Sequence, residues 1–310
     1  MVSAVIFVAT SCVSPLTGFA FWETNLAYEG ESIYNYLQVK NLSDRTILST
    51  NVLFGVQSVT MKDKGLTGMY YDTALAAPAL ADNANSALIL GMGTGTFARQ
   101  LMQYYPKMNI TGVEIDQKIT DLAGEYFDEP ADIPVTTYDG RAWLAASHDK
   151  YDVIMVDAYQ DITIPFQMSS TEFFTMVREH LNPGGVMVVN MNMISDGQGS
   201  INEALSDTIA SVFGNGNTLT ADVPNTTNRE LFAKKPGSGS EENSMQQASK
   251  ALNLRETTYE RTGSEDLEWY MEEVASRFRK VNEPDSASTI LTDDKAPVEV
   301  LGMHAIDQII

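Results

Sequence analysis

The stretch that decides the fold is Ala87-Leu-Ile-Leu-Gly-Met-Gly-Thr-Gly95. Its first four residues form a short apolar run, which is typical of a strand buried on both faces of a parallel sheet. The glycines then allow a tight turn, and residues 96–105 have helical spacing. Such a turn presents free backbone N–H groups at a helix N-terminus, where phosphates and nucleotides bind. The stretch therefore predicts the first strand and helix of a nucleotide-binding sheet.

The alternation of strand and helix continues along the chain. Further strands are expected at residues 110–114, 135–137, 151–156, 186–191, 217–221 and 230–234. Together with the first strand they predict an α/β fold with a doubly wound, mainly parallel, seven-stranded sheet. Before it, residues 24–65 alternate β-branched and aromatic residues with turn residues, and the strand pattern includes 32–39. This pattern indicates a small N-terminal antiparallel β-unit.

Helix signals accompany these strands. A single helix is expected over residues 70–80, and Ser169 with Glu172 forms a capping box that opens a helix ending near Leu181. A charged helical stretch at 266–281 follows a flexible segment rich in Gly and Ser. We expect its charges to face solvent.

Composition excludes several functions. The single Cys rules out a disulfide framework, and the three scattered His leave no recognisable metal-binding spacing, so we expect no metal. Forty-one Asp and Glu against 20 Lys and Arg give a formal charge of −21. Such a chain repels phosphate backbones, which disfavours a nucleic-acid partner, whereas a cationic substrate would be attracted.

The N-terminus contains no charged residue before Glu23. An apolar segment at residues 1–22 is long enough to cross a bilayer as a helix. We therefore expect a membrane segment and a membrane-associated protein whose catalytic domain is cytoplasmic. The alternative is an apolar N-terminal segment that packs on the rest of the chain.

Carboxylates follow the next three predicted strands. Glu114 ends the second strand, Asp139 with Gly140 ends the third, and Asp157 ends the fourth. In open parallel sheets, ligands bind across the carboxyl ends of the strands. Glu114 can accept hydrogen bonds from both ribose hydroxyls, and Asp139 can accept one from an adenine amino group. The set predicts an adenosine site, although each acid alone could equally be a helix N-cap.

The glycine spacing separates two nucleotide classes. A dinucleotide-binding turn has the spacing G-x-G-x-x-G, whereas Gly91, Gly93 and Gly95 have the spacing G-x-G-x-G. With Val113-Glu-Ile-Asp116 ending the next strand, this arrangement resembles the Rossmann-like fold of the S-adenosylmethionine-binding superfamily.

A narrower resemblance is carried by several stretches: Ala87–Gly95, Val113–Asp116, Tyr138-Asp-Gly140, Tyr151-Asp-Val-Ile-Met-Val-Asp157, Gly55-Val-Gln57 and Tyr70-Tyr71-Asp72. Together they resemble the spermidine synthase (polyamine aminopropyltransferase) family over residues 28–235. The closing Leu291-Thr-Asp-Asp-Lys-Ala-Pro-Val-Glu299 is similar to the tail of bacterial spermidine synthase-like proteins fused to membrane segments.

The resemblance implies the transfer of an aminopropyl group from decarboxylated S-adenosylmethionine to a small cationic amine such as putrescine. It implies catalytic roles for Asp157, Asp161 and Tyr70, and substrate-binding roles for Gln57, Tyr71, Tyr159 and Gln160. The implied donor-binding residues are Gly91, Gly93, Thr94, Gly95, Glu114, Ile115, Asp139 and Gly140. A homodimer is a further implication.

The implied organisation has four segments. They are an apolar membrane segment at 1–22, a small β-domain at 23–66, a Rossmann-like transferase domain at 67–235, and a linker with a C-terminal helical extension at 236–310.

The chain departs from the family pattern at two positions. Thr94 stands where the family has an Asp, and Gln160 stands where the family has the second Asp after the fourth strand, with Asp161 displaced by one residue. Two alternatives therefore stay open. One is a methyltransferase that uses S-adenosylmethionine itself on an unknown small-molecule acceptor, and the other is a non-catalytic nucleoside-binding domain of a membrane protein.

Overall fold

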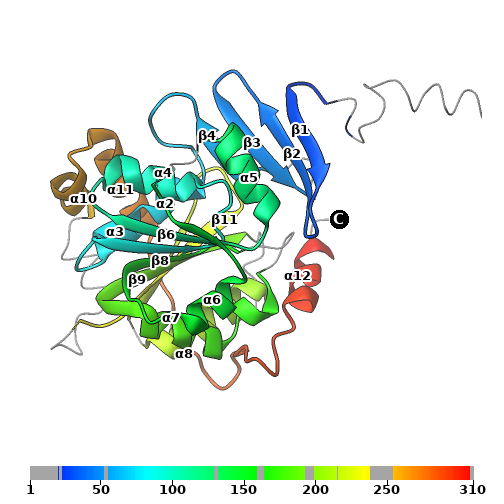
Figure 1. Ribbon diagram of the computed structural model, residues 1–310. Coiled ribbons are helices and arrows are strands. Elements are labelled where there is room, and N and C mark those ends of the chain that lie inside the picture. Colours follow the sequence, from blue (N-terminus) through cyan, green and yellow to red (C-terminus); the bar gives the residue numbers. More distant parts are fainter. Residues whose placement is uncertain are drawn as a thin grey trace, which may run out of the picture.

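The chain forms a small N-terminal sheet and a large central sheet (Figure 1). The computed structural model describes residue 20 and residues 23–51, 55–128, 132–158, 164–192, 199–214, 216–237 and 254–307.

The central sheet has eight strands in the order β12-β10-β11-β9-β8-β5-β6-β7. The strands are β5 (Ser86–Leu90), β6 (Asn109–Glu114), β7 (Val135–Thr137), β8 (Tyr151–Val156), β9 (Leu181–Asn192), β10 (Thr218–Asp222), β11 (Asn228–Lys234) and β12 (Arg279–Lys280). Strands β5 to β9 are mutually parallel, and β11 returns antiparallel to β9. The predicted α/β fold class is confirmed, and the expected seven strands are extended by β12.

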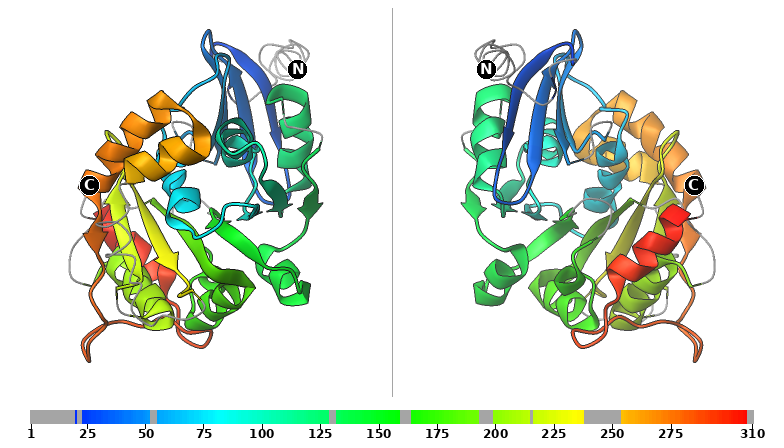
Figure 2. Two further views of the ribbon diagram at one scale, coloured as in Figure 1. Left: turned by 90° about the vertical axis from the view of Figure 1, so that its left-hand side faces the viewer. Right: turned by 90° about the vertical axis from the view of Figure 1, so that its right-hand side faces the viewer.

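Helices cover both faces of this sheet (Figure 2). One face packs against α2 (Tyr70–Ala74), α3 (Ala76–Leu80), α4 (Thr96–Tyr104), α10 (Leu254–Thr262) and α11 (Glu265–Arg277). The other face packs against α6 (Gly140–Ala146), α7 (Thr171–His180), α8 (Ile201–Phe213) and α12 (Val298–Asp307). Along β5, Ile89 faces the first core whereas Leu88 and Leu90 face the second. Burial on both faces explains why this strand is continuously apolar.

The small sheet has the order β1-β2-β3-β4 and is antiparallel throughout. Its strands are β1 (Leu26–Glu31), β2 (Tyr36–Asn41), β3 (Arg45–Thr50) and β4 (Ser58–Met61). Its inner face packs against helix α5 (Gln117–Tyr126), with Leu37 and Leu48 beside Leu122. At the edge of the small sheet formed by β4, the Val59 N–H donates to Thr96 Oγ1, and the Thr96 hydroxyl donates in turn to the Val59 carbonyl. The small sheet is thus held directly beside the glycine turn.

Two predicted elements differ locally from the structure. The helix expected over 70–80 is interrupted at Leu75, which lies between α2 and α3. Pro78 explains the interruption, because its nitrogen has no hydrogen to donate and is tolerated only in the first turn of a helix. The N-cap of α7 is Ser170, one residue after the expected Ser169, and its Oγ accepts from the Phe173 N–H.

The 32–39 stretch is also not a single strand. Residues 32–35 form the turn between β1 and β2, because Ser32 Oγ accepts hydrogen bonds from the backbone N–H groups of Tyr34 and Asn35. Ser side chains often stabilise turns in this way.

The membrane-associated location predicted from the sequence is wrong for the part of the chain described. Within the described ranges, no helix is long and apolar enough to cross a bilayer. The longest helices there, α8 and α11, have 13 residues each, whereas a span needs about 20. The segment expected to span the membrane, residues 1–22, lies outside the described residues except for Ala20. Ala20 is buried, and its N–H donates to Glu29 Oε1.

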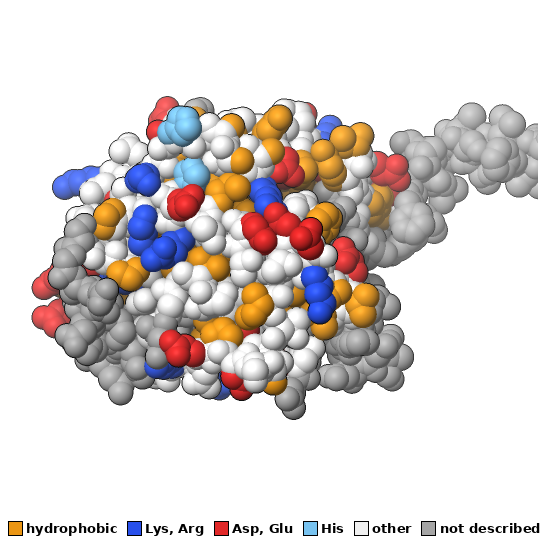
Figure 3. All heavy atoms as spheres, turned by 90° about the horizontal axis from the view of Figure 1, so that it is seen from below, with side chains coloured by type: hydrophobic (Ala, Val, Ile, Leu, Met, Phe, Trp, Pro, Cys, Tyr) orange, Lys and Arg blue, Asp and Glu red, His pale blue; other side chains and the backbone are white. Residues whose placement is uncertain are grey.

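Seen from below, the face that carries α6, α7 and α8 mixes Lys and Arg with Asp and Glu side chains, and apolar side chains lie between them (Figure 3). On this face the strong net negative charge is therefore not gathered into one patch.

Candidate functional site

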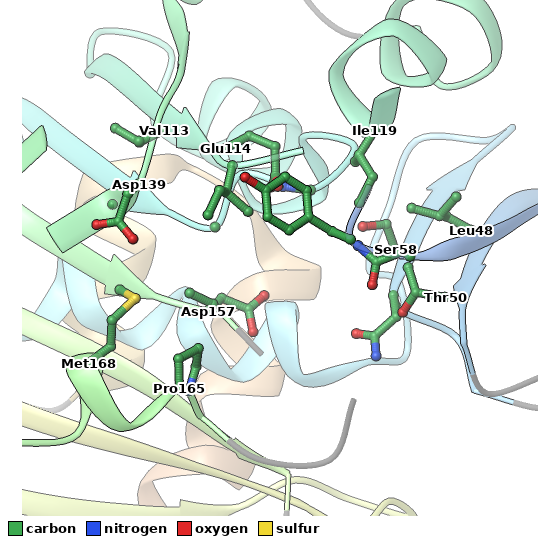
Figure 4. Close-up of a pocket in the computed structure, with 18 of the residues that line it drawn as sticks. Leu48, Thr50, Ser58, Val113, Glu114, Ile119, Asp139, Asp157, Pro165 and Met168 are labelled. Carbon is green, nitrogen blue, oxygen red and sulfur yellow. The ribbon is translucent and has the colours of Figure 1, made fainter. Parts of the chain in front are cut away.

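A cavity of about 290 Å³ lies at the carboxyl ends of β5, β6, β7 and β8, beside the small sheet (Figure 4). The sequence-predicted residues that line it are Gln57, Tyr70, Tyr71, Gly91, Gly93, Glu114, Ile115, Asp139, Gly140 and Asp157. The structure thus brings together residues from the small sheet, from α2 and from four strand ends.

The glycine turn forms the floor of this cavity. The N–H groups of Gly91 and Met92 both donate to the Val113 carbonyl, which ties the turn to the next strand. Gly91 has φ +89°, and a Cβ at this position would lie 2.4 Å from the carbonyl oxygen of Asp157. Only glycine therefore lets the turn pass this close to the end of β8.

Glu114 stands beside the turn and is buried. Its Oε2 accepts from the Gly93 N–H at 2.8 Å, and its Oε1 accepts from the Asp116 N–H at 3.0 Å. Burial is the main reason that the pKa of Glu114 lies above its usual value. Each carboxylate oxygen has two lone pairs, so both oxygens can still accept a hydrogen bond from a ligand hydroxyl.

Asp139 combines two roles that the sequence left as alternatives. It is the N-cap of α6, and its Oδ1 accepts from the Ala142 N–H at 2.7 Å. It also lines the cavity, as Pro165 and Met168 do (Figure 4). Apolar walls with a few polar groups are typical of small-molecule binding sites.

Asp157 lies at the end of β8 and points into the cavity (Figure 4). Its Oδ2 accepts from the Tyr70 hydroxyl at 2.7 Å, and its Oδ1 accepts from Asn190 Nδ2 at 3.1 Å. Burial raises the pKa of Asp157 to about 7, the nearby Glu114 charge adds to the rise, and the two hydrogen bonds oppose it. A carboxylate with such a pKa can accept a proton near neutral pH.

The two tyrosines of α2 pack together in the wall, with ring centroids 4.0 Å apart. Burial is the largest cause that raises the pKa of Tyr70 far above its usual value, followed by the Asp157 charge, so its hydroxyl stays protonated as a donor. The Tyr71 hydroxyl donates to the backbone carbonyl of Gln57 at 2.7 Å. Tyr71 therefore fixes the segment before β4 against the cavity.

The turn between β1 and β2 is a wall that the sequence analysis missed. Tyr34 and Asn35 line the cavity, and Ser32 Oγ and Asn35 Nδ2 both donate to Asp116 Oδ2. Asp116 Oδ1 accepts from the Lys118 N–H and so caps α5. The Ser and Asn of this turn were the available signal, but they lay within a pattern interpreted as a strand.

Other lining residues were missed as well. They are Leu48, Thr50, Ser58, Val113, Ile119, Tyr138, Ala158, Pro165, Gln167 and Met168. Asn190, which holds Asp157, was also missed, since nothing in an apolar strand sequence identifies it. Pro165, Gln167 and Met168 follow the fourth strand, so their position after a strand end was a usable signal.

Five predicted site residues are not placed at the cavity. Thr94 and Gly95 are not among its lining residues, and the buried Thr94 hydroxyl has no hydrogen-bond partner in the described structure. Tyr159, Gln160 and Asp161 lie outside the described residues. Within the described ranges, no group of three or more His, Cys, Asp or Glu side chains is arranged to hold a metal ion.

Comparisons with known proteins agree with this geometry. A family model described as the spermine/spermidine synthase domain matches residues 69–235. A probable polyamine aminopropyl transferase of Bifidobacterium longum (strain NCC 2705) is 99% identical over 310 residues, which cover 100% of this chain and 70% of that protein.

Two solved structures share the fold. A probable spermidine synthase from Corynebacterium glutamicum ATCC 13032 has a TM-score of 0.60 at 21% identity, over 85% of this chain and 98% of that one. A spermidine synthase in complex with the transition-state analogue AdoDATO has a TM-score of 0.54 at 18% identity, over 68% of this chain and 72% of that one. The family model spans more than half of the chain and one relative matches all of it, so the chain belongs to the spermine/spermidine synthase family of polyamine aminopropyltransferases.

Proposed function

We propose that this protein transfers an aminopropyl group from decarboxylated S-adenosylmethionine to a small cationic amine such as putrescine. The observation that carries the proposal is Asp157, a buried carboxylate whose pKa is about 7, at the cavity edge that also holds Glu114. Asp157, which would bind the amine, and Glu114, which would bind the nucleoside, thus line the same cavity.

The donor would occupy the cavity between the glycine turn and the strand ends. Glu114 would accept hydrogen bonds from the ribose hydroxyls, and Asp139 with Gly140 would meet the adenine edge. Ile115 would pack on the base, and the backbone at Gly91 and Gly93 would approach the donor closely because no side chain intervenes.

The acceptor amine would lie beside Asp157, Tyr70 and Tyr71, with Gln57 at the same wall. An amine attacks only when it is neutral, so Asp157 first accepts a proton from the bound ammonium group. The nitrogen lone pair then forms a bond to the carbon beside the sulfonium. The carbon–sulfur bond breaks, and its electron pair stays on sulfur, which becomes a neutral thioether. Tyr70 keeps its proton and orients the carboxylate.

Product analysis by mass spectrometry tests the proposal. Purified protein is incubated with putrescine and other diamines, once with decarboxylated S-adenosylmethionine and once with S-adenosylmethionine. We expect an aminopropylated amine with the decarboxylated donor only, and a matched Asp157→Asn protein should form almost none. A methylated product, or no product with either donor, would overturn the proposal. The homodimer stays a prediction that analytical ultracentrifugation would test.

A further inference from the structure

A second buried acid lies close to this site without a partner. Glu230 in β11 has an exposed fraction of 0%, and neither of its carboxyl oxygens has a hydrogen-bond partner in the described structure. Buried polar groups are nearly always hydrogen-bonded, and buried charges are nearly always paired. This carboxyl group therefore requires an explanation.

Glu230 belongs to a row of polar residues that crosses three neighbouring strands. Glu230 pairs directly with Asn190 across β11 and β9. Asn190 in turn donates to Asp157, the residue that follows β8. Side chains alternate between the faces of a strand, and Phe232 packs in the core under α2 and α3 whereas Leu231 packs in the opposite core. Glu230 therefore lies on the α2 side, the side from which Tyr70 reaches Asp157.

No cation of the protein neutralises Glu230 in the described structure. The nearest basic residues along its own strand are engaged elsewhere: Arg229 pairs with Asp222, and Lys234 pairs with Asp82. The two undescribed stretches that follow β8 and β9, residues 159–163 and 193–198, contain no Lys, Arg or His in their sequence. Since no described cation pairs with Glu230, we take its compensating positive charge to be a bound proton or a ligand.

We propose that Glu230 is a specificity-determining residue that holds a second ammonium group of the acceptor amine, two strands away from the reacting nitrogen at Asp157. Neighbouring strands lie about 4.8 Å apart, and β9 lies between β8 and β11. The backbones at Asp157 and Glu230 are therefore roughly 10 Å apart across the sheet, a distance that a short diamine can span between the two side chains. A monoamine would leave Glu230 without its cation. This inference rests on the proposed function and adds to it the residue that favours a diamine over a monoamine.

Electrostatics agree with this geometry. Burial raises the pKa of Glu230 well above its usual value, and the Asp157 charge adds to the rise. The two acids thus disfavour each other's charge in the empty site. A diamine with one ammonium group beside each carboxylate compensates both buried charges, whereas a monoamine leaves one of the two carboxylates without a cation.

The test compares two acceptors in two proteins. Wild-type protein and Glu230→Gln are assayed with putrescine and with n-butylamine, which has the same carbon chain and one amino group, at saturating decarboxylated S-adenosylmethionine. We expect the preference for putrescine, as a ratio of kcat/KM values, to fall at least tenfold in Glu230→Gln. The loss should appear in the KM for putrescine, with the KM for the donor unchanged.

Asp152→Asn is the matched control. Asp152 is also a buried acid, but it lies in β8 at the other end of the sheet and accepts from the Asn85 N–H and from Asn182 Nδ2. This variant should keep the wild-type preference. Thermal unfolding of each protein verifies that it is folded, and Glu230→Met, of similar size and without charge, gives the same comparison if the Gln protein does not fold.

The two proposals fail in different ways. A wild-type enzyme that aminopropylates putrescine and a Glu230→Gln enzyme with the same diamine preference would overturn only the role of Glu230, which would then carry its own proton. A wild-type protein that transfers no aminopropyl group to any amine would overturn both. An equal fall in kcat/KM for putrescine and for n-butylamine in Glu230→Gln would also overturn the assignment, because it would indicate a general disturbance of the site.

Discussion

Replacing Asp157 with Asn should make the protein more stable at alkaline pH while it slows aminopropyl transfer strongly. Asp157 has a pKa of about 7 in the folded chain against an ordinary value of 3.8. Between these values the folded state binds more protons than the unfolded state, so the Asp157 contribution to stability falls as the pH rises through this window. At about 1.4 kcal/mol for each unit of pKa, the charged carboxylate costs about 4 kcal/mol once the pH is above 7.

Asn carries no charge at any pH, so this cost disappears in the variant. By pH 5 only a part of the cost is present in the wild-type protein, since most folded molecules still hold the proton. We therefore expect the stability gain of Asp157→Asn to be larger at pH 8 than at pH 5 by about 2.5 kcal/mol. Any hydrogen bond that the Asn amide makes less well with Tyr70 or Asn190 shifts both values together and leaves the difference unchanged.

Urea denaturation followed by circular dichroism at the two pH values measures this difference. The aminopropyl-transfer rate should fall by about 10²–10⁴-fold, the usual contribution of a general base. A variant whose stability relative to wild type is the same at pH 5 and pH 8 would refute the reasoning, because the carboxylate would then be as easily charged inside the protein as in water.

Three further changes test the rest of the site. Glu114→Gln should weaken donor binding in calorimetry by roughly 10–100-fold, the worth of a hydrogen bond to a charged group, with the amine KM unchanged; an unaltered donor affinity would remove Glu114 from the ribose site. Tyr70→Phe removes a hydrogen bond that lowers the Asp157 pKa. The acid limb of kcat/KM should therefore move to higher pH by roughly one to two units, and an unmoved limb would contradict this coupling. Gly91→Ala should lower the free energy of unfolding by at least about 1–3 kcal/mol, because φ is +89° and the new Cβ meets the Asp157 carbonyl. If the Gly91→Ala protein instead has the wild-type free energy of unfolding in chemical denaturation, the turn can shift to accommodate the new Cβ.

The central sheet was predictable because its strands are short apolar runs that end in glycines or acids. Burial on both faces produces such runs, and helices between parallel strands produce their spacing. The cavity followed from the same logic, since Gly91, Glu114, Asp139 and Asp157 occupy ends of four parallel strands. The two-residue strand β12 carries too little pattern to be predicted.

What the sequence did not reveal depends on contacts between distant segments. Asn190 and Glu230 lie 33 and 73 residues after Asp157, and only the register of β8, β9 and β11 brings the three together. Ser32 belonged to an alternating pattern typical of a strand, and its turn is fixed by local side-chain hydrogen bonds and by Asp116. Hydrophobic periodicity indicates which face of a helix or strand is buried, but it does not indicate which polar side chains from distant segments will contact each other in the fold.

The β1–β2 turn has one more consequence. The family model begins at residue 69, yet Tyr34 and Asn35, which lie before it, form part of the cavity wall. The strand-end acids and this wall therefore belong to different stretches of the chain, and the turn is tied to the large domain by two hydrogen bonds to the Asp116 carboxylate, from Ser32 and Asn35. If the proposed function is right, substitutions in the turn would reshape how the donor is enclosed without moving the strand-end acids, so donor selectivity and reactivity would be open to independent change in evolution or in the laboratory.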